Sequence, residues 1–434
     1  MQTSLIQNAH GDLVTDAAYD FYGVRLATCS LDHRIKIWQL DESDGTWTPV
    51  ADWKAHGAAV TKLSWAHPEF GSVLASSSFD RTVKVWEEIP AENTDQPQTN
   101  GASTAANGPG TRWLERAVLA DAKGTVRAVE FAPHQLGLKL VRALRRSPPC
   151  ALLTSCRQAA IASDNHLRVY ECPEVPALTN WTLAQEADVP ALPSTSTSRP
   201  HTYAAPTPTH VSGTPAADAS LVANALQQQQ QQPPLQRGAG GREADGGWSV
   251  SWCKEQYWGE VLATCSGVSG VVKIIQLSPS RRPITLLSLD PSPPVDSGPI
   301  SEDGIAPYAV TSVAWAPSCG RSYHLVATGS RDGHVRIWKL RPSSLDEERI
   351  ENSDDAKWTG SVVADFDHHK SSVGRVEWNI TGTILSSAGN DGRIRLWKPT
   401  TGNIWRPAGH ITVEQAEEQQ KEGDIEMDDG NPAE

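Results

Sequence analysis

The residue types best suited to catalysis in this chain are histidine, aspartate and hydroxyl side chains that recur near tryptophan. Histidine beside aspartate can activate a serine or threonine hydroxyl when all three groups meet in one place. The chain holds three such groups instead of one, with His10, Asp32 and Trp38 in the first, His56, Asp80 and Trp86 in the second, and His369, Asp391 and Trp397 in the third. Asp164, and Asp332 with Trp338, occupy matching positions without the histidine. This repetition predicts a structural hydrogen-bond network in each repeat, and no catalytic site.

The aspartate and tryptophan of each group lie in a ten-residue segment that occurs six times. Aliphatic residues at its fifth and seventh places and a basic residue at the sixth follow the period of a half-buried β-strand. Aspartate at the second place of five segments predicts a tight turn before that strand. The six segments are LDHRIKIWQL from 31, FDRTVKVWEE from 79, SDNHLRVYEC from 163, VSGVVKIIQL from 268, RDGHVRIWKL from 331 and NDGRIRLWKP from 390.

A second predicted strand lies upstream of each segment and ends in an aromatic residue. Between the two is a short strand of small residues, such as LATCS from 26. Three strands and a connecting fourth, repeated with a tryptophan ending, are typical of the blades of a WD40 β-propeller. We therefore expect an all-β fold of six blades. The upstream aromatic residues are Tyr19, Trp65, Phe131, Trp252, Trp315 and Trp378.

The propeller is expected over residues 8–410, with two interruptions and a separate tail. Residues 141–158 lengthen the third blade, and are interpreted either as translated intron sequence or as a true loop. Residues 187–247 are rich in Pro, Thr, Ser and Gln, a composition that predicts disorder. Residues 414–434 form an acidic, disordered tail whose role is open. The blades are expected near 8–42, 54–90, 112–175, 246–280, 306–342 and 362–400.

Composition excludes several function classes. The formal net charge of -13 disfavours nucleic-acid binding, which needs lysine and arginine to neutralise phosphates. The seven cysteines follow no zinc spacing, and the neighbours His368 and His369 lack completing ligands, so neither a metal nor another cofactor is expected. The chain has no apolar stretch long enough to insert directly in a membrane.

Several stretches of the repeats resemble one branch of the WD40 superfamily, the small propeller nucleoporins of the Y-shaped complex. They include YDFYG from 19, LATCSLDHRIKIWQL from 26, FAPHQLGLKL from 131, WAPSCGRSYHLVATGSRDGHVRIWKL from 315 and NITGTILSSAGNDGRIRLWK from 379. This resemblance implies an open propeller, completed in trans by a blade from an α-solenoid nucleoporin. It also implies a scaffold role beside other Y-complex subunits in the outer ring of the nuclear pore complex, at the nuclear envelope, in protein and mRNA transport. The family further serves in a coat-like complex on the vacuolar membrane that regulates nutrient (TORC) signalling.

Six blades and a short N-terminal lead predict that the ring stays open, with unpaired strand edges that a partner would cover by β-augmentation. Two other functions compete with the nucleoporin interpretation. The segment WAHPEFG from 65 suits equally the small propeller subunit of the COPII vesicle coat. A WD40 adaptor that binds peptides on its top face is the other alternative. The sequence leaves open the exact partners, the interface residues and the balance between pore and vacuolar complexes.

Overall fold

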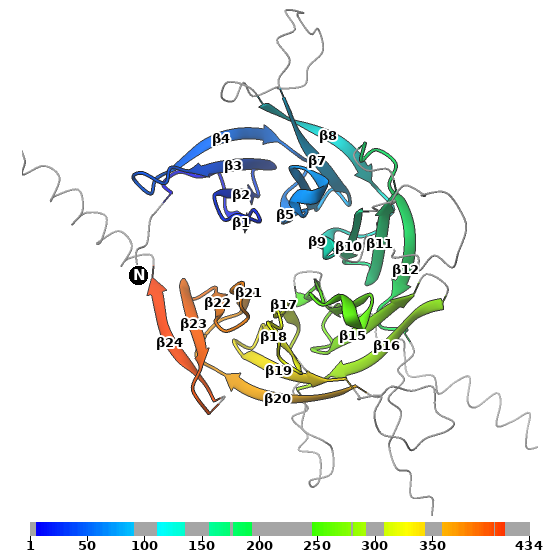
Figure 1. Ribbon diagram of the computed structural model, residues 1–434, viewed down its shortest axis with the longest axis vertical. Helices are drawn as coiled ribbons and strands as arrows, with labels where there is room; N and C mark the ends of the chain where they lie inside the picture. The colour runs from blue at the N-terminus through cyan, green and yellow to red at the C-terminus, as the bar shows by residue number, and fades with distance from the viewer. Residues whose placement is uncertain are drawn as a thin grey trace, which may run out of the picture.

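A computed structural model gives the fold of this chain. It describes residues 6–90, 111–134, 156–173, 177–192, 245–278, 281–291, 308–342, 358–402 and 404–412. Within these ranges the chain forms six sheets of four antiparallel strands, which confirms the six-bladed all-β propeller (Figure 1). Every blade consists of four strands that are consecutive in sequence.

The first three blades occupy the N-terminal half of the chain. Blade 1 comprises Val14–Tyr19 (β1), Arg25–Ser30 (β2), Arg34–Leu40 (β3) and Trp47–Lys54 (β4). Blade 2 comprises Val60–Trp65 (β5), Val73–Ser78 (β6), Val83–Pro90 (β7) and Thr111–Leu119 (β8), with a 3-10 turn at Pro68–Phe70 (η1). Blade 3 comprises Val126–Phe131 (β9), Cys156–Ala162 (β10), His166–Cys172 (β11) and Thr182–Asp188 (β12).

The remaining three blades repeat this plan. Blade 4 comprises Ser249–Trp252 (β13), Val261–Cys265 (β14), Val272–Ser278 (β15) and Arg281–Leu289 (β16), with a 3-10 turn at Gln256–Trp258 (η4). Blade 5 comprises Val310–Trp315 (β17), His324–Ser330 (β18), Val335–Arg341 (β19) and Thr359–Phe366 (β20). Blade 6 comprises Val373–Trp378 (β21), Leu385–Gly389 (β22), Arg393–Pro399 (β23) and Trp405–Thr412 (β24).

The repeated ten-residue segment forms the turn between the second and third strands of each blade, followed by the third strand. Its third residue has a positive φ in all six blades, a conformation that glycine adopts most easily. The aspartate at the second place accepts a backbone hydrogen bond from the residue two positions later, as Asp32 does from Arg34 at 2.9 Å. The third-place residues are His33, Arg81, Asn165, Gly270, Gly333 and Gly392.

The hydrophobic core lies between neighbouring blades. Ile35 and Ile37 on β3 are fully buried in a cluster with Val60, Leu63 and Leu74 of blade 2. Because the fifth and seventh places of each segment point towards the next blade in the chain, the sheets pack face to face around the ring.

Several expected boundaries are wrong. The expected ends of the blades at 42, 90, 175, 280, 342 and 400 leave out the fourth strands β4, β8, β12, β16, β20 and β24. Residues near 362 do not begin blade 6, because β20 pairs with β19 and completes blade 5. Residues near 112 do not begin blade 3, because β8 pairs with β7 and completes blade 2. Cys156, Arg157 and Gln158 do not belong to the insertion expected at 141–158, because they lie in β10 and pair with β11. The interruption expected at 187–247 begins too early, because Ala187 and Asp188 lie in β12 and pair with β11.

Residues 189–192 and 245–247 of the second interruption are also described. The rest of the expected interruptions lies outside the described residues. This applies to the segment LGLKL, to residues 141–155, to residues 193–244 and to the acidic tail at 414–434.

Candidate interaction surface at the opening between blades 6 and 1

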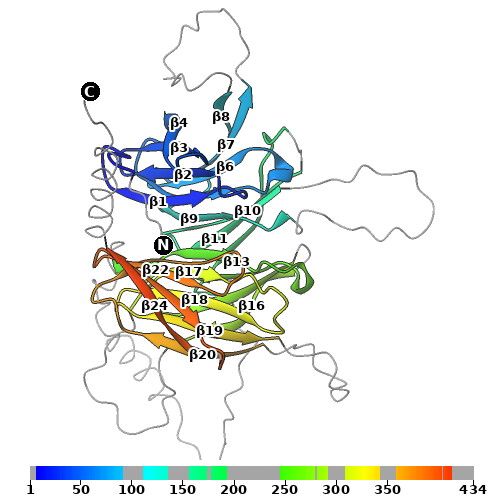
Figure 2. The ribbon, with the colours of Figure 1, turned by 60° about the vertical axis from the view of Figure 1, so that its left-hand side comes forward.

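The ring is open between its last and first blades. The innermost strands contact one another in chain order from β1 to β21, through β5, β9, β13 and β17. Blade 6, in orange and red, and blade 1, in blue, leave an opening between them (Figure 1). Figure 2 turns this side forward and shows blade 1 above and blade 6 below.

The face of blade 6 towards the opening exposes residues that every other blade buries. Ile394 occupies the fifth place of its segment and is 44% exposed, whereas Ile35 and Val335 at the same place are 0% exposed. Leu396 at the seventh place is half-buried, whereas its counterparts in the other five blades are all buried. The apolar pattern of β23 is therefore that of a strand that packs against another blade.

The face of blade 1 towards the opening shows the same exposure. Val14 begins β1 and is 49% exposed, whereas Val60 and Val373, which begin β5 and β21, are fully buried. Tyr19, at the end of β1, is also exposed, whereas Trp252 and Trp315 at the same place are buried. Two apolar sheet faces thus border the opening, and we call them the opening faces of blades 1 and 6.

At the inner rim the two blades do meet. Arg375 on β21 forms an ion pair with Asp16 on β1 and donates a hydrogen bond of 2.8 Å to the carbonyl oxygen of Ala17. Asp16 is buried and also accepts from the Leu63 backbone N–H at 2.9 Å and from Lys62 Nζ at 3.2 Å. Among the described residues, an ion pair and a hydrogen bond to a backbone carbonyl thus join blade 6 to blade 1 at the central channel.

The expectation that unpaired strand edges border the opening is wrong. Blades 1 and 6 each have a full set of four paired strands, so the opening is bordered by sheet faces. A partner would therefore fill the opening chiefly by packing apolar side chains, and edge-strand hydrogen bonding would be secondary.

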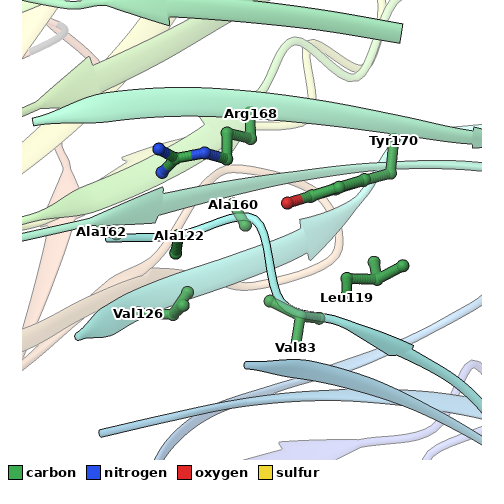
Figure 3. Close-up of a pocket in the computed structure, with 8 residues that line it drawn as sticks. All are labelled: Val83, Leu119, Ala122, Val126, Ala160, Ala162, Arg168 and Tyr170. Carbon is green, nitrogen blue, oxygen red and sulfur yellow. The ribbon is translucent and has the colours of Figure 1, made fainter. Parts of the chain in front are cut away.

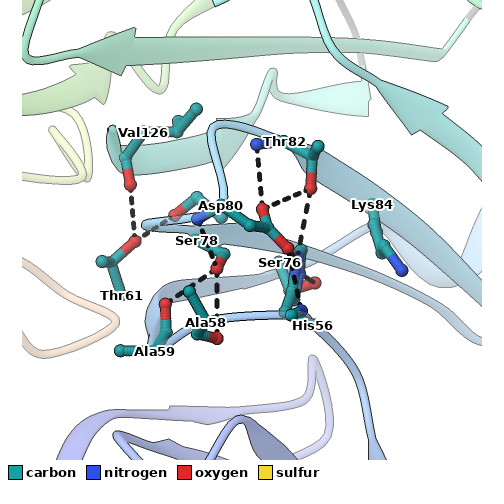
Figure 4. Close-up of polar contacts among 12 residues, drawn as sticks. His56, Ala58, Ala59, Thr61, Ser76, Ser78, Asp80, Thr82, Lys84 and Val126 are labelled. Carbon is teal, nitrogen blue, oxygen red and sulfur yellow. Dashed lines mark hydrogen bonds and ion pairs between the residues drawn. The ribbon is translucent and has the colours of Figure 1, made fainter. Parts of the chain in front are cut away.

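The structure brings each predicted His, Asp and Trp group together within its own blade. In blade 2, His56 Nδ1 lies 2.9 Å from Asp80 Oδ2, and His56 Nε2 lies 2.8 Å from Ser76 Oγ (Figure 4). Trp86 Nε1 donates to the same Ser76 hydroxyl at 2.9 Å. Thr82 Oγ1 adds a 2.6 Å hydrogen bond to Asp80.

Blades 1 and 6 repeat this arrangement. His10 lies 3.0 Å from Asp32 and 2.8 Å from Thr28 Oγ1, to which Trp38 donates at 2.9 Å. In blade 6 the corresponding distances are 3.1 Å from His369 to Asp391, 2.8 Å from His369 to Ser387, and 2.9 Å from Trp397 to Ser387. The complete network thus occurs in blades 6, 1 and 2, which include both sides of the opening.

The other blades have partial networks. Asp164 accepts from Arg168 at 2.8 Å, and Asp332 accepts from Arg336 at 3.2 Å, so an arginine occupies the role of the histidine. Trp338 donates to Thr328 Oγ1 at 3.1 Å. In blade 4 a buried isoleucine, Ile275, replaces the tryptophan.

The protonation states of the histidines and aspartates in these networks suit a structural role better than proton transfer to a substrate. Burial lowers the pKa of His56 and outweighs the opposing effect of Asp80, so the imidazole is neutral at physiological pH. Burial opposes ionisation of Asp391, but hydrogen bonds from Arg395 and His369 hold its pKa at about 2. Each histidine is occupied at both ring nitrogens, which leaves none available to a substrate.

The described part of the structure offers little room for a small ligand between blades 2 and 3. The cavity there has a volume of about 10 Å³, roughly that of one water, and is lined by Val83, Leu119, Ala122, Val126, Ala160, Ala162, Arg168 and Tyr170 (Figure 3). Within the described ranges, no helix has the length and apolarity needed to span a bilayer.

Comparison with known proteins agrees with this architecture. The family model described as WD domain, G-beta repeat matches residues 2–39, 47–87, 305–339 and 360–398. The chain is 33% identical to nucleoporin SEH1 of Danio rerio over 92% of its own length and 84% of that protein. It is 30% identical to nucleoporin SEH1 of Saccharomyces cerevisiae, over 94% and 99% of the two chains, and 32% identical to that of Homo sapiens, over 92% and 85%. With its six WD40-type blades and this identity along nearly the whole chain, the protein belongs to the nucleoporin SEH1 family.

Proposed function

We propose that this protein is a non-catalytic scaffold subunit of the outer ring of the nuclear pore complex, and that its opening receives a blade from an α-solenoid nucleoporin. Membership of the SEH1 family supports the location, because the relatives are named nucleoporins. The subunit would thereby serve nucleocytoplasmic transport of protein and mRNA. The vacuolar coat-like complex that regulates nutrient signalling is a second assembly in which the same opening would be used.

The exposure of Ile394 carries the proposal. The fifth place of the segment is an aliphatic residue in all six blades, and only in blade 6 does it lack a neighbouring sheet among the described residues. Full burial of an exposed side chain of this size is worth about 1.5–3 kcal/mol, and Ile394, at 44% exposed, would contribute roughly half of that to an interface. An inserted sheet with two apolar faces would bury Ile394 on one side and Val14 on the other.

The experiment compares two substitutions in the tagged, full-length protein expressed in its own cells. Ile394→Glu places a charge on the opening face of blade 6, and should abolish recovery of the α-solenoid partner by affinity purification and mass spectrometry. Ile380→Glu is the matched control, because Ile380 is 91% exposed on the β21–β22 connection. Both variants should keep the thermal stability of the unaltered protein.

The identity of the recovered proteins separates the competing functions. Outer-ring nucleoporins that are lost only with Ile394→Glu support the proposal. A COPII cage protein in their place would assign the chain to the vesicle coat, and recovery of vacuolar signalling subunits alone would assign it to the vacuolar complex. A peptide-binding adaptor would keep its partners in both variants, because its binding face lies elsewhere on the ring.

A further inference from the structure

Two histidines and a glutamate from neighbouring blades converge on one face of the ring. His67 and Glu69 belong to the connection between β5 and β6 in blade 2, around η1, and His134 follows β9 in blade 3. One ligand atom from each of the three residues lies within 4.8 Å of the other two. The convergence follows from the fold, because β5 and β9 are adjacent inner strands and both connections leave the same end of the blades.

The two imidazole rings stack at a centroid distance of 3.8 Å and an interplanar angle of 18°. Phe21, from the β1–β2 connection of blade 1, contacts the His67 ring edge-on at 4.9 Å. Stacked cationic imidazoles would repel each other, so this geometry requires at least one neutral ring. Partial burial and the neighbouring His134 both lower the pKa of His67, while Glu69 raises it. Neutral imidazole is the form that binds metals.

We propose that His67, Glu69 and His134 bind a Zn²⁺ ion that joins the face connections of blades 2 and 3. Two imidazole nitrogens and one carboxylate form a ligand set that suits zinc, whereas Mg²⁺ and Ca²⁺ prefer oxygen ligands alone. Three protein ligands leave a fourth position for water or for a side chain of a bound partner. The site is separate from the opening and does not depend on the proposed scaffold function.

Zinc binding requires local changes at the ligands. The lone pairs of the two stacked imidazoles lie in nearly parallel planes, so one ring must turn out of the stack before both can bind one ion. His67 must also give up or replace a hydrogen bond. Its Nδ1 accepts a 3.3 Å hydrogen bond from the Glu69 backbone N–H, which places the ring proton on Nε2. Coordination through Nε2 needs the other tautomer and ends this contact, whereas coordination through Nδ1 replaces it with the metal. Either route moves side chains of the connections and not the strands, because β5 and β9 end before the ligands.

The test is a calorimetric titration of the metal-free, full-length protein with Zn²⁺ in a non-chelating buffer at neutral pH. We expect one equivalent to bind. His134→Ala and Glu69→Gln should each weaken binding at least about tenfold, since loss of supporting residues around metal sites already costs that much. His410→Ala is the matched control, because His410 is an exposed histidine on β24 far from the site in the chain.

A second measurement identifies the ligands directly. Co²⁺ should bind the unaltered protein with visible absorption bands typical of nitrogen and oxygen coordination, and His134→Ala should remove them. Excess Mg²⁺ should not displace Zn²⁺. The proposal is overturned if no Zn²⁺ binds, or if His134→Ala and His410→Ala bind with the same affinity, since that result would assign the ion to scattered surface histidines. Thermal unfolding of each variant shows that its fold is intact.

Discussion

Arg375 on β21 forms an ion pair with Asp16 on β1, and this contact connects the last blade of the chain to the first. Apart from it, the two blades diverge and present apolar faces to the opening. Elsewhere around the ring, neighbouring blades share buried apolar clusters. Blade 6 and blade 1 are therefore joined by polar contacts at the rim of the channel, where an inserted blade would have to place its own innermost strand.

Replacing Arg375 should loosen this junction. Arg375→Met removes the ion pair and the hydrogen bond to Ala17, at a cost of about 1 to 3 kcal/mol in the free energy of unfolding. Asp16 keeps its contacts to Lys62 and Leu63, so blade 1 should remain folded. Amide hydrogen exchange should become faster in β1 and β21 and stay unchanged in β9. If the substitution changes the exchange rates of all three strands by the same factor, or changes none of them, the ion pair does not hold blades 6 and 1 together.

The same substitution, isoleucine to alanine, should differ in its effect on stability between the apolar face of β19 in blade 5 and that of β23 in blade 6. Ile337 lies at the seventh place on β19 and is packed against blade 6, so Ile337→Ala should cost about 2–5 kcal/mol. Ile394→Ala, on the opening face, should cost less than about 1 kcal/mol. Guanidinium unfolding of the isolated protein measures both. Similar losses would mean that the blade 6 face is already covered within this chain.

The hydrogen-bond network of blade 6 should make stability dependent on pH in the acidic range. The folded-state pKa of Asp391 is about 2, below the ordinary value of 3.8. A carboxylate whose pKa is lower in the folded than in the unfolded protein stabilises the fold at pH values above its unfolded-state pKa. This contribution is lost as the pH falls from about 4 towards 2. The stability difference between the unaltered protein and Asp391→Asn should therefore shrink over that range. Asp367→Asn, at an exposed carboxylate, is the control and should show no such trend. A constant difference for Asp391→Asn would contradict the assigned network.

The turn of blade 2 carries a strained residue that can be relieved. Arg81 is exposed and has a φ of 69°, a conformation that costs a residue with a side chain about 1–2 kcal/mol. Arg81→Gly should therefore raise the free energy of unfolding by about 1 kcal/mol, whereas Arg81→Ala should leave it nearly unchanged. Thermal unfolding distinguishes the two, and equal stabilities would show that the turn carries no strain.

Features that repeat with a fixed period could be predicted from the sequence. The inner strands end at the six expected aromatic residues, from Tyr19 to Trp378. The fourth strands have no comparable signal, because they lie at the outside of the ring with mixed burial. For this reason the sequence predicts the segment TRWLERAVL in blade 3, whereas it forms β8 of blade 2. The end of the third-blade insertion was misplaced because Arg157 and Gln158 are polar residues buried within a strand, which an apolar pattern does not reveal.

Contacts between blades were the least predictable feature. His67 and His134 follow the aromatic ends of adjacent inner strands, Trp65 and Phe131, by two and three residues. Comparing such similar offsets between neighbouring blades places the two histidines together. The adjacent histidines His368 and His369 are a misleading signal, because both ring nitrogens of His369 are occupied by Asp391 and Ser387. The sequence also does not show what borders the opening. The pattern of a strand is the same whether a missing neighbour exposes the edge of its sheet or the face.

The central claim is that the opening face of blade 6 is free in the isolated protein and covered in the assembly. Leu396→Cys places a thiol on that face, and its rate of modification by a maleimide can be followed at that site by mass spectrometry. We predict rapid modification of the isolated protein and strong protection in the complex purified from cells, with Ile380→Cys equally reactive in both. Equal reactivity of Leu396→Cys in the two states would contradict the claim.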